Sequence, residues 1–119
     1  MADTSHVART AQRAPGTVEI TVVGELDADR SELSDALTAA LENGAERIVV
    51  DLLDVSFIDS SALRDLLLAR REVEARNGWI RLVYTNHLIG RVLSVTGLEQ
   101  VLPRYPSVSE ALEEESDGS

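Results

Sequence analysis

The chain has 119 residues, of which 44% are hydrophobic and 27% charged, a composition typical of one globular domain with a core of modest size. Its formal net charge of −10 argues against binding to nucleic acid or to anionic membranes, because phosphate contacts need a basic surface. The absence of cysteine excludes disulfides and thiolate metal sites.

The amino-terminal region, residues 1–16, is polar and ends in Pro15-Gly16, which indicates a tail or an edge strand. Met1 to His6 lack the basic start and the apolar segment of a signal peptide. No apolar run in the chain approaches the roughly 18 residues needed to cross a bilayer. We therefore expect a cytoplasmic protein that does not act at a membrane.

A strand and a helix are predicted next. Thr17 to Val23 is rich in β-branched residues and partly alternating, as a strand should be, and Gly24 breaks it. A helix then begins near Asp29 and Glu32, which have cap-like spacing, and ends at Asn43-Gly44. Its apolar face is formed by Leu33, Ala36, Leu37, Ala40 and Leu41.

The central part of the chain predicts a buried strand followed by a long helix. Arg47 to Leu52 is nearly continuous in apolar residues, which is typical of a strand covered on both faces. Residues 53–58 are expected to form a connection with Val55 and Phe57 buried. The helix runs from about Ser60 to Arg76, and Leu67, midway along its apolar face, is expected to be buried.

The last third of the chain continues the alternation of strands and helices. We expect a strand over 79–84, a short helix over 88–95, an edge strand over 99–102, a final helix from 106 to about 114, and a disordered end over 115–119. This order predicts an α/β fold in one domain over residues 17–114. Its sheet should be mixed but mostly parallel, with four to five strands and about four helices.

The stretch from Phe57 to Arg64 is the candidate functional site. It places Asp59, Ser60 and Ser61 where the long helix begins, and such side chains accept hydrogen bonds from the free N–H groups of a first turn. The same helix end tolerates added negative charge, so a serine here is either a cap or a phosphate acceptor. If Ser60 caps the helix, Ser61 is left to face solvent.

A second acidic position is expected close to these serines. Asp27 follows the first predicted strand just as Ser61 follows the next, and neighbouring parallel strands end at the same sheet edge. Asp27 then either caps a local turn or frames the acceptor and contacts a partner. Asp59 is more easily explained as structural, and so is Asp51 at the end of its strand.

The segment Ile58-Asp59-Ser60-Ser61-Ala62-Leu63 resembles the phosphoacceptor motif of the anti-sigma factor antagonists, small bacterial proteins built from one STAS domain. Gly24-Glu25-Leu26-Asp27 is similar to the strand-end motif of that family, and 92–98 and 109–112 fit the end of its domain. Ala62 departs from the family pattern, which usually has glycine there.

The resemblance implies a regulatory protein that is not an enzyme and needs no cofactor or metal. It implies binding to an anti-sigma factor that is a serine kinase of the GHKL ATPase type, with release of a sigma factor. Phosphorylation would end binding, and a serine phosphatase would restore it. The family pattern favours Ser61 as the acceptor, with Ser60 as the alternative, and a partner surface formed by Asp27, Asp59, Ser60, Ser61 and Ala62. It also suggests a short first strand around His6 to Ala8.

Two other interpretations remain open. The chain is either a STAS protein of another assembly, such as a stressosome or a lipid-transport complex, or an α/β enzyme or ligand-binding domain. The sequence has no Gly-x-Ser-x-Gly elbow and no glycine-rich phosphate loop, which argues against the second. His6 and His87 have no cysteine or closely spaced acid beside them, so we expect surface histidines rather than metal ligands.

Overall fold

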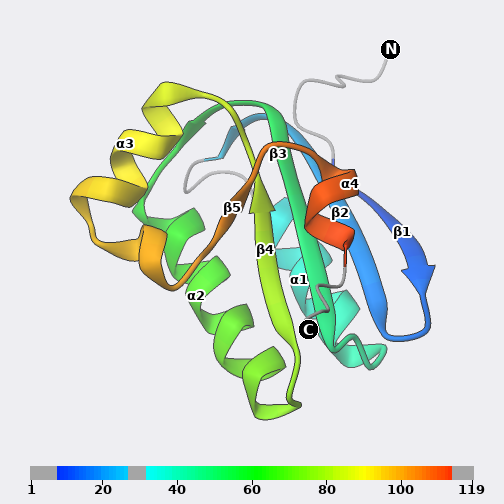
Figure 1. Ribbon diagram of the computed structural model, residues 1–119. Helices are drawn as coiled ribbons and strands as arrows, with labels where there is room; N and C mark the ends of the chain where they lie inside the picture. The colour runs from blue at the N-terminus through cyan, green and yellow to red at the C-terminus, as the bar shows by residue number, and fades with distance from the viewer. Residues whose placement is uncertain (1–7, 27–31, 114–119) are drawn as a thin grey trace.

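The computed structural model describes residues 8–26 and 32–113 of the chain. Its elements, in chain order, are β1 (Ala8–Ala14), β2 (Thr17–Leu26), α1 (Glu32–Glu42), β3 (Arg47–Ile58), α2 (Ser60–Ala75), β4 (Trp79–Val83), α3 (His87–Val95), the 3₁₀ turn η1 (Leu98–Gln100), β5 (Arg104–Tyr105) and α4 (Val108–Leu112). This part of the chain thus holds five strands and four α-helices, which confirms the predicted α/β fold class (Figure 1).

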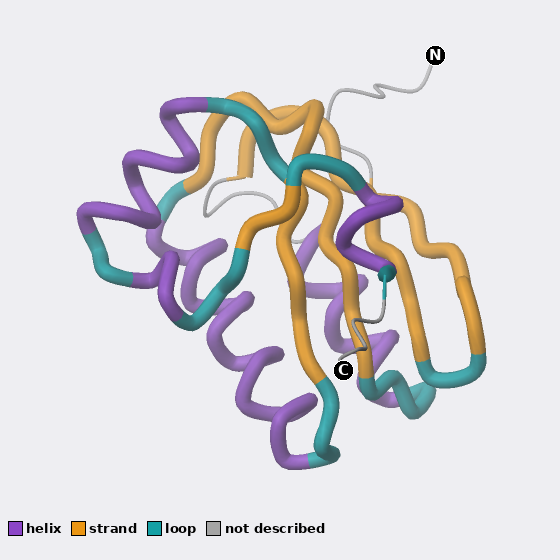
Figure 2. Tube along the Cα trace, in the orientation of Figure 1, coloured by secondary structure: helices purple, strands orange, loops and turns teal. Residues whose placement is uncertain are grey.

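The sheet has the strand order β1-β2-β3-β4-β5, so every strand pairs with its neighbour in sequence. Only β1 and β2 are antiparallel; the other three pairs are parallel and are joined by the helices, as right-handed crossovers require (Figure 2). The first strand, β1, is the edge strand that was one of the two expectations for the amino-terminal region. Of the segment expected to form it, His6 lies outside the described residues.

Two apolar layers hold the sheet between the helices. The larger layer packs the inward faces of α1, α2 and α3 against alternate residues of β2, β3 and β4, including Ile48, Val50 and Leu52. The smaller layer lies on the opposite face, where Ala111 of α4 packs with Val49 and Val83. Because successive side chains of β3 point to opposite faces, its apolar run serves both layers, as predicted for a strand covered on both sides.

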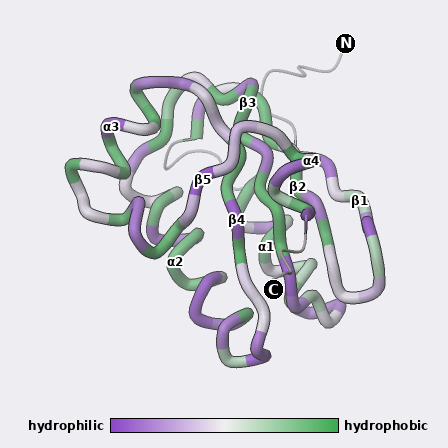
Figure 3. The backbone as a smooth tube through the Cα atoms, in the orientation of Figure 1, coloured by the Kyte–Doolittle hydropathy of each residue, from purple (hydrophilic) through white to green (hydrophobic). Residues whose placement is uncertain are grey.

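The long helix α2 contributes one apolar stripe to the larger layer, and Figure 3 shows hydrophobic and hydrophilic residues alternating along it. The residues buried along this stripe are Ala62, Leu63, Leu66, Ala69 and Val73, which recur at the three- and four-residue spacing of a helix face. The expectation that Leu67 is buried was wrong. Leu66 is fully buried, whereas Leu67 is only partly buried at the margin of the stripe.

The carboxyl ends of β2 and β3 lie further along the chain than the sequence predicted. Residues 53–58 are not a connection: β3 continues to Ile58 and pairs with β2 as far as Leu26. Irregular register at Thr21/Val23 and at Gly24/Glu25 disturbs the two-residue period here, which explains why the sequence did not read as a strand. Val55 is buried as expected, but Phe57 is 48% exposed, so that expectation was wrong.

The edge strand expected over 99–102 was also wrong. Glu99 and Gln100 belong to η1, Val101 and Leu102 form a turn, and the edge strand is the two-residue β5, directly after Pro103. Proline has no N–H to donate to a sheet, but its carbonyl still accepts, and the Leu82 N–H binds it at 3.0 Å. The strand β5 therefore starts at Arg104, the first residue after the proline that has a backbone N–H group.

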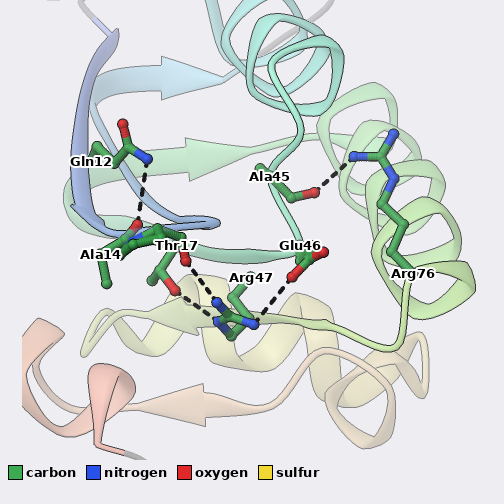
Figure 4. Close-up of polar contacts among 8 residues, drawn as sticks. Gln12, Ala14, Thr17, Ala45, Glu46, Arg47 and Arg76 are labelled. Atoms are coloured by element: carbon green, nitrogen blue, oxygen red, sulfur yellow. Dashed lines mark hydrogen bonds and ion pairs between the residues drawn. The ribbon is translucent and has the colours of Figure 1, made fainter.

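The amino ends of the strands are tied together by arginine side chains (Figure 4). The Arg47 guanidinium donates to the Thr17 hydroxyl at 2.7 Å and to the Pro15 carbonyl at 2.8 Å. The Arg76 guanidinium donates to the carbonyls of Leu41 and Ala45, at 3.1 and 2.8 Å, and so joins the end of α2 to the end of α1. These contacts fix the sheet end opposite to the candidate site.

The turn between α2 and β4 is unusually tight. Asn77 takes the left-handed backbone conformation with φ 64°, and the Trp79 N–H donates to the Glu46 carbonyl at 3.0 Å. Between them, a Cβ atom placed on Gly78 would lie 1.6 Å from that same carbonyl oxygen. Gly78 is therefore required by the close approach of two backbones, and the left-handed residue that follows α2 is the asparagine.

Candidate functional site

The candidate site lies at the carboxyl end of β3, where the chain turns directly into α2. Ile58 pairs with Leu26 at the end of β2, and the Asp59 N–H donates to the Leu26 carbonyl at 3.0 Å. The carboxyl ends of two neighbouring parallel strands thus lie side by side here. Binding sites of open α/β sheets are found at this edge. Asp27, which follows Leu26 in sequence, lies outside the described residues, so its expected place beside the serines remains a prediction.

The cap of α2 is Asp59. Its backbone is extended (φ −110°, ψ −176°), and its Oδ1 atom accepts hydrogen bonds from the N–H groups of Ser61 and Ala62, at 3.0 and 3.1 Å. The interpretation in which Ser60 caps the helix was therefore wrong. The helix already begins at Ser60, so the residue before it has the extended backbone that a cap needs.

The two serines have different environments. The Ser61 hydroxyl is partly buried and donates to Asp59 Oδ1 at 2.8 Å, which gives that one oxygen a third hydrogen bond. Ser60 is exposed, and its hydroxyl has no hydrogen bond to any part of residues 8–26 and 32–113. The geometric reason for preferring Ser61 is thus reversed, because Ser60 is the serine whose oxygen is both accessible and unengaged.

Ala62 is 5% exposed, and its methyl group belongs to the buried stripe of α2. The departure from the usual glycine therefore adds a side chain that points into the core rather than toward a partner. Its N–H is engaged by Asp59, so Ala62 supports the cap. The surface it offers to a partner is small.

Two carboxylates lie near the start of α2: Asp59 is its cap, and Asp65 is in its second turn, next to Arg64. The pKa of Asp65 is raised above its ordinary value, chiefly because burial disfavours the charged carboxylate. The Arg64 guanidinium opposes this shift, and the negative charge of Asp59 adds to it. An additional anion at the helix start would therefore act on two carboxylates that already influence each other.

A second strand-to-helix junction lies beside the first. Asn86 caps α3 by accepting from the Leu88 N–H at 2.7 Å, and its Nδ2 donates to the Val55 carbonyl of β3 at 3.3 Å. This bond places the start of α3 next to the last residues of β3. His87 is exposed at that start. Across the described ranges, no group of three His, Cys, Asp or Glu side chains is arranged to hold a metal ion.

Exposed apolar side chains at this edge of the sheet were not expected from the sequence. Phe57 is 48% exposed and Leu88 is 64% exposed, at the ends of β3 and the start of α3. The available signal was the two-residue period of a strand: Ile58 faces the core, so Phe57 should face away from it. In the part of the chain that the structure describes, no helix is long and apolar enough to cross a membrane.

Comparison with known proteins places this geometry in a family. The STAS domain model matches residues 8–111. A Thermotoga neapolitana protein with the provisional name of an anti-sigma factor antagonist is 38% identical over 74 residues, which are 62% of this chain and 66% of that protein. The chain thus spans just under two thirds of that relative. The anti-sigma-B factor antagonist of Staphylococcus aureus is 30% identical over 85 residues, 71% of this chain and 79% of that protein.

Solved structures agree. An anti-sigma factor antagonist from Mycobacterium paratuberculosis superimposes with a TM-score of 0.81 at 25% identity, covering 93% of this chain and 94% of that chain. The Bacillus cell fate determinant SpoIIAA in its phosphorylated form gives a TM-score of 0.69 at 25% identity, covering 88% and 96%. The chain therefore belongs to the STAS domain family, among the anti-sigma factor antagonists.

Proposed function

We propose that this protein is an anti-sigma factor antagonist whose binding is switched off by phosphorylation of Ser60. The observation that carries the choice of residue is the contrast between the two hydroxyls: Ser60 is exposed and unengaged within the described residues, whereas Ser61 donates to Asp59. Family membership supports the function, and the similar SpoIIAA is known in a phosphorylated and an unphosphorylated form.

The partner that adds the phosphate is an anti-sigma factor with serine kinase activity of the GHKL ATPase type. It transfers the γ-phosphoryl group of ATP to Ser60 Oγ: the new O–P bond forms, the bond to ADP breaks, and the hydroxyl proton leaves to the kinase or to water. The unphosphorylated protein binds this kinase in the cytoplasm and thereby releases a sigma factor. A serine phosphatase hydrolyses the phosphate and restores binding.

The phosphate acts on binding while the fold stays intact. It adds about −1.5 to −2 charges at the N-terminus of α2, where the helix dipole accommodates an anion. The cap of α2 stays in place, because the N–H groups of Ser61 and Ala62 already donate to Asp59 Oδ1 and are not needed by the phosphate oxygens. The partner, in contrast, meets a bulky dianion beside Asp59. A penalty of about 3 kcal/mol would weaken the complex more than a hundredfold.

The test incubates the wild type, Ser60→Ala and Ser61→Ala with the copurified kinase and ATP, and maps phosphate by mass spectrometry. We expect phosphate on Ser60 in the wild type and in Ser61→Ala, and none in Ser60→Ala. Ser60→Glu should keep the circular dichroism of the wild type and bind the kinase weakly. Phosphate on Ser61 in the wild type would overturn the choice of Ser60 and support Ser61, the acceptor that the family pattern favours. No phosphate on either serine, with the kinase active on another substrate, would overturn the switch.

A further inference from the structure

We infer that Phe57 is an apolar anchor, buried by the kinase partner when it docks over Ser60. This inference rests on the proposed function and names a contact that the capping and phosphoacceptor residues do not include. It follows from where the structure places the aromatic side chains, from the size that a protein interface must have, and from the charges that surround Phe57.

The aromatic residues of this chain are few: one Phe, one Trp and two Tyr. Arg81 stacks on Trp79 at 3.8 Å and on Tyr105 at 5.3 Å, measured to the ring centroids, and Tyr84 is 4% exposed with Arg104 over its ring. Each of these three rings therefore has a partner within the molecule. The phenylalanine, which has no polar atom to gain from water, is the aromatic side chain left about half exposed.

Single exposed apolar residues are common, so position has to decide whether this one matters. Phe57 precedes Ser60 by three residues of extended or strand-end chain, which separates their Cα atoms by at most about 10 Å. A stable interface buries about 800 Å² per partner, a patch of roughly 16 Å radius. An interface of this size that is centred near Ser60 can reach Phe57, and aromatic side chains are enriched in the centres of interfaces.

The charges around Phe57 define the chemistry of the surface that receives it. Glu25, its register partner on β2, is exposed, and so is Asp54 on the same strand. With Asp59 two residues further along the chain, three carboxylates lie near Phe57 in register or in sequence. The complementary surface is an apolar pocket with a basic rim, since a pocket lined by acids would meet repulsion. Leu88, on the adjacent start of α3, extends the apolar area of this end of the molecule.

The chain offers a matched control for Phe57. Leu68 of α2 is 47% exposed, almost the same fraction as Phe57, and it lines the groove between α1 and α2. It lies eight residues after Ser60, which is about 12 Å along the helix axis. Truncating each side chain to alanine removes a similar kind of exposed apolar group. Phe57 lies at the end of β3 beside the acceptor, whereas Leu68 lines the groove between α1 and α2.

The experiment measures the affinity of the unphosphorylated full chain for the anti-sigma kinase by calorimetry, and the rate of Ser60 phosphorylation over a range of substrate concentrations. Phe57→Ala should weaken binding at least tenfold and raise KM with little change in kcat, because the anchor holds the complex but touches no reacting atom. Phe57→Leu should recover part of the affinity. Leu68→Ala should stay within twofold of the wild type, and all three should keep the wild-type circular dichroism.

Three outcomes would overturn the anchor. Phe57→Ala could bind as tightly as the wild type, Leu68→Ala could lose as much affinity as Phe57→Ala, or Phe57→Ala could abolish a self-association seen by sedimentation while leaving kinase binding unchanged. The last outcome would make a second copy of the chain the occupant. These results are distinct from a failure of the proposed function, in which the kinase neither binds the wild type nor phosphorylates Ser60.

Discussion

Two of the strand-to-helix junctions at the carboxyl edge of the sheet, those before α2 and α3, solve one structural problem in two ways. Asp59 and Asn86 both have an extended backbone, and both use a side-chain oxygen to accept N–H groups of the following helix. At each junction the first helical residue, Ser60 or His87, is exposed. The second junction shows that a good cap needs no serine after it. The hydroxyl of Ser60 is thus surplus to the fold, which makes it available for function.

The two caps also differ in charge and in the elements that their side chains contact. The Asn86 side chain accepts a hydrogen bond from α3 with its amide oxygen and donates one to the Val55 carbonyl with its amide nitrogen. It therefore links its helix to a neighbouring strand. Asp59 concentrates three hydrogen bonds from the first turn of its own helix on one oxygen. The first junction is therefore a local, negatively charged unit, and the second is a neutral link between elements. Substitutions at the two caps should therefore change the stability of the fold in different ways.

The largest effect should come from removing the packing that supports the first junction. Leu66 of α2 is fully buried, so Leu66→Ala should lower the free energy of unfolding by about 2–5 kcal/mol. Leu67→Ala, at the margin of the buried stripe, should cost clearly less because part of its side chain already contacts water. Urea unfolding of the two variants measures the difference. An equal or larger loss for Leu67→Ala would mean that the helix is rotated relative to the structure described above.

An intermediate effect is expected from the caps themselves. Asp59→Ala and Asn86→Ala should each cost about 0.5–2 kcal/mol, the usual range for a lost N-cap. Asp59→Asn is the sharper test, because it gives the first junction the cap chemistry of the second. It keeps an oxygen acceptor and loses only the charge near the helix dipole, worth about 0.3–1 kcal/mol.

Salt distinguishes the two contributions at Asp59. Thermal unfolding at low and high ionic strength should show that the cost of Asp59→Asn shrinks with salt, because the charge–dipole interaction is screened. The cost of Asn86→Ala should be nearly independent of salt, since its cap is neutral. A salt-independent cost at Asp59 would show that its charge contributes nothing beyond its hydrogen bonds.

The smallest effect concerns pH. The folded-state pKa of Asp65 is raised by burial, with Arg64 opposing and Asp59 adding to the shift. In the window just above the ordinary value of 3.8 the folded state therefore holds more protons than the unfolded state, so stability falls as pH rises through it. Asp65→Asn should remove this small cost and melt slightly higher than the wild type at pH 7.

The same comparison at about pH 3 supplies the control for Asp65, because the carboxyl is then protonated in both states and the advantage of Asp65→Asn should vanish. In an Asp59→Asn background the advantage at pH 7 should be smaller, since one cause of the raised pKa is absent. An advantage of Asp65→Asn that persists unchanged at low pH would assign it to packing in the groove between α1 and α2.

The sequence predicted those parts of the molecule in which a periodic pattern is long. The apolar runs of β3 and β4 and the spaced apolar residues of α1 and α2 specify the α/β order, and Asp59 with two serines marks the start of α2. The sequence could not show which of the two serines is hydrogen-bonded at the helix start and which one is free. Their roles depend on whether the cap falls at position 59 or 60, and a helix boundary inferred from sequence carries an uncertainty of that size.

The exposed side of the site was missed for a related reason. The pairing of β3 with β2 is irregular between Val55 and Phe57, so a two-residue count from Val55 places Phe57 in the core, whereas a count from Ile58 places it outside. Hydrophobicity alone cannot separate a residue that the fold buries from one that a partner buries. The two-residue β5 is too short to have a period at all.

The glycine at position 78 has a consequence for how sequences with this fold can vary. Its missing side chain lets β4 begin against the Glu46 carbonyl, so any larger residue must push the two backbones apart and break the Trp79–Glu46 bond. That bond sets the register in which β4 pairs with β3, from Arg47 opposite Trp79 onward. A relative with another residue at this position should therefore have compensated elsewhere, by an added residue in the turn or a displaced strand. Position 78 is a marker for aligning distant members of the family where overall identity is too low to do so.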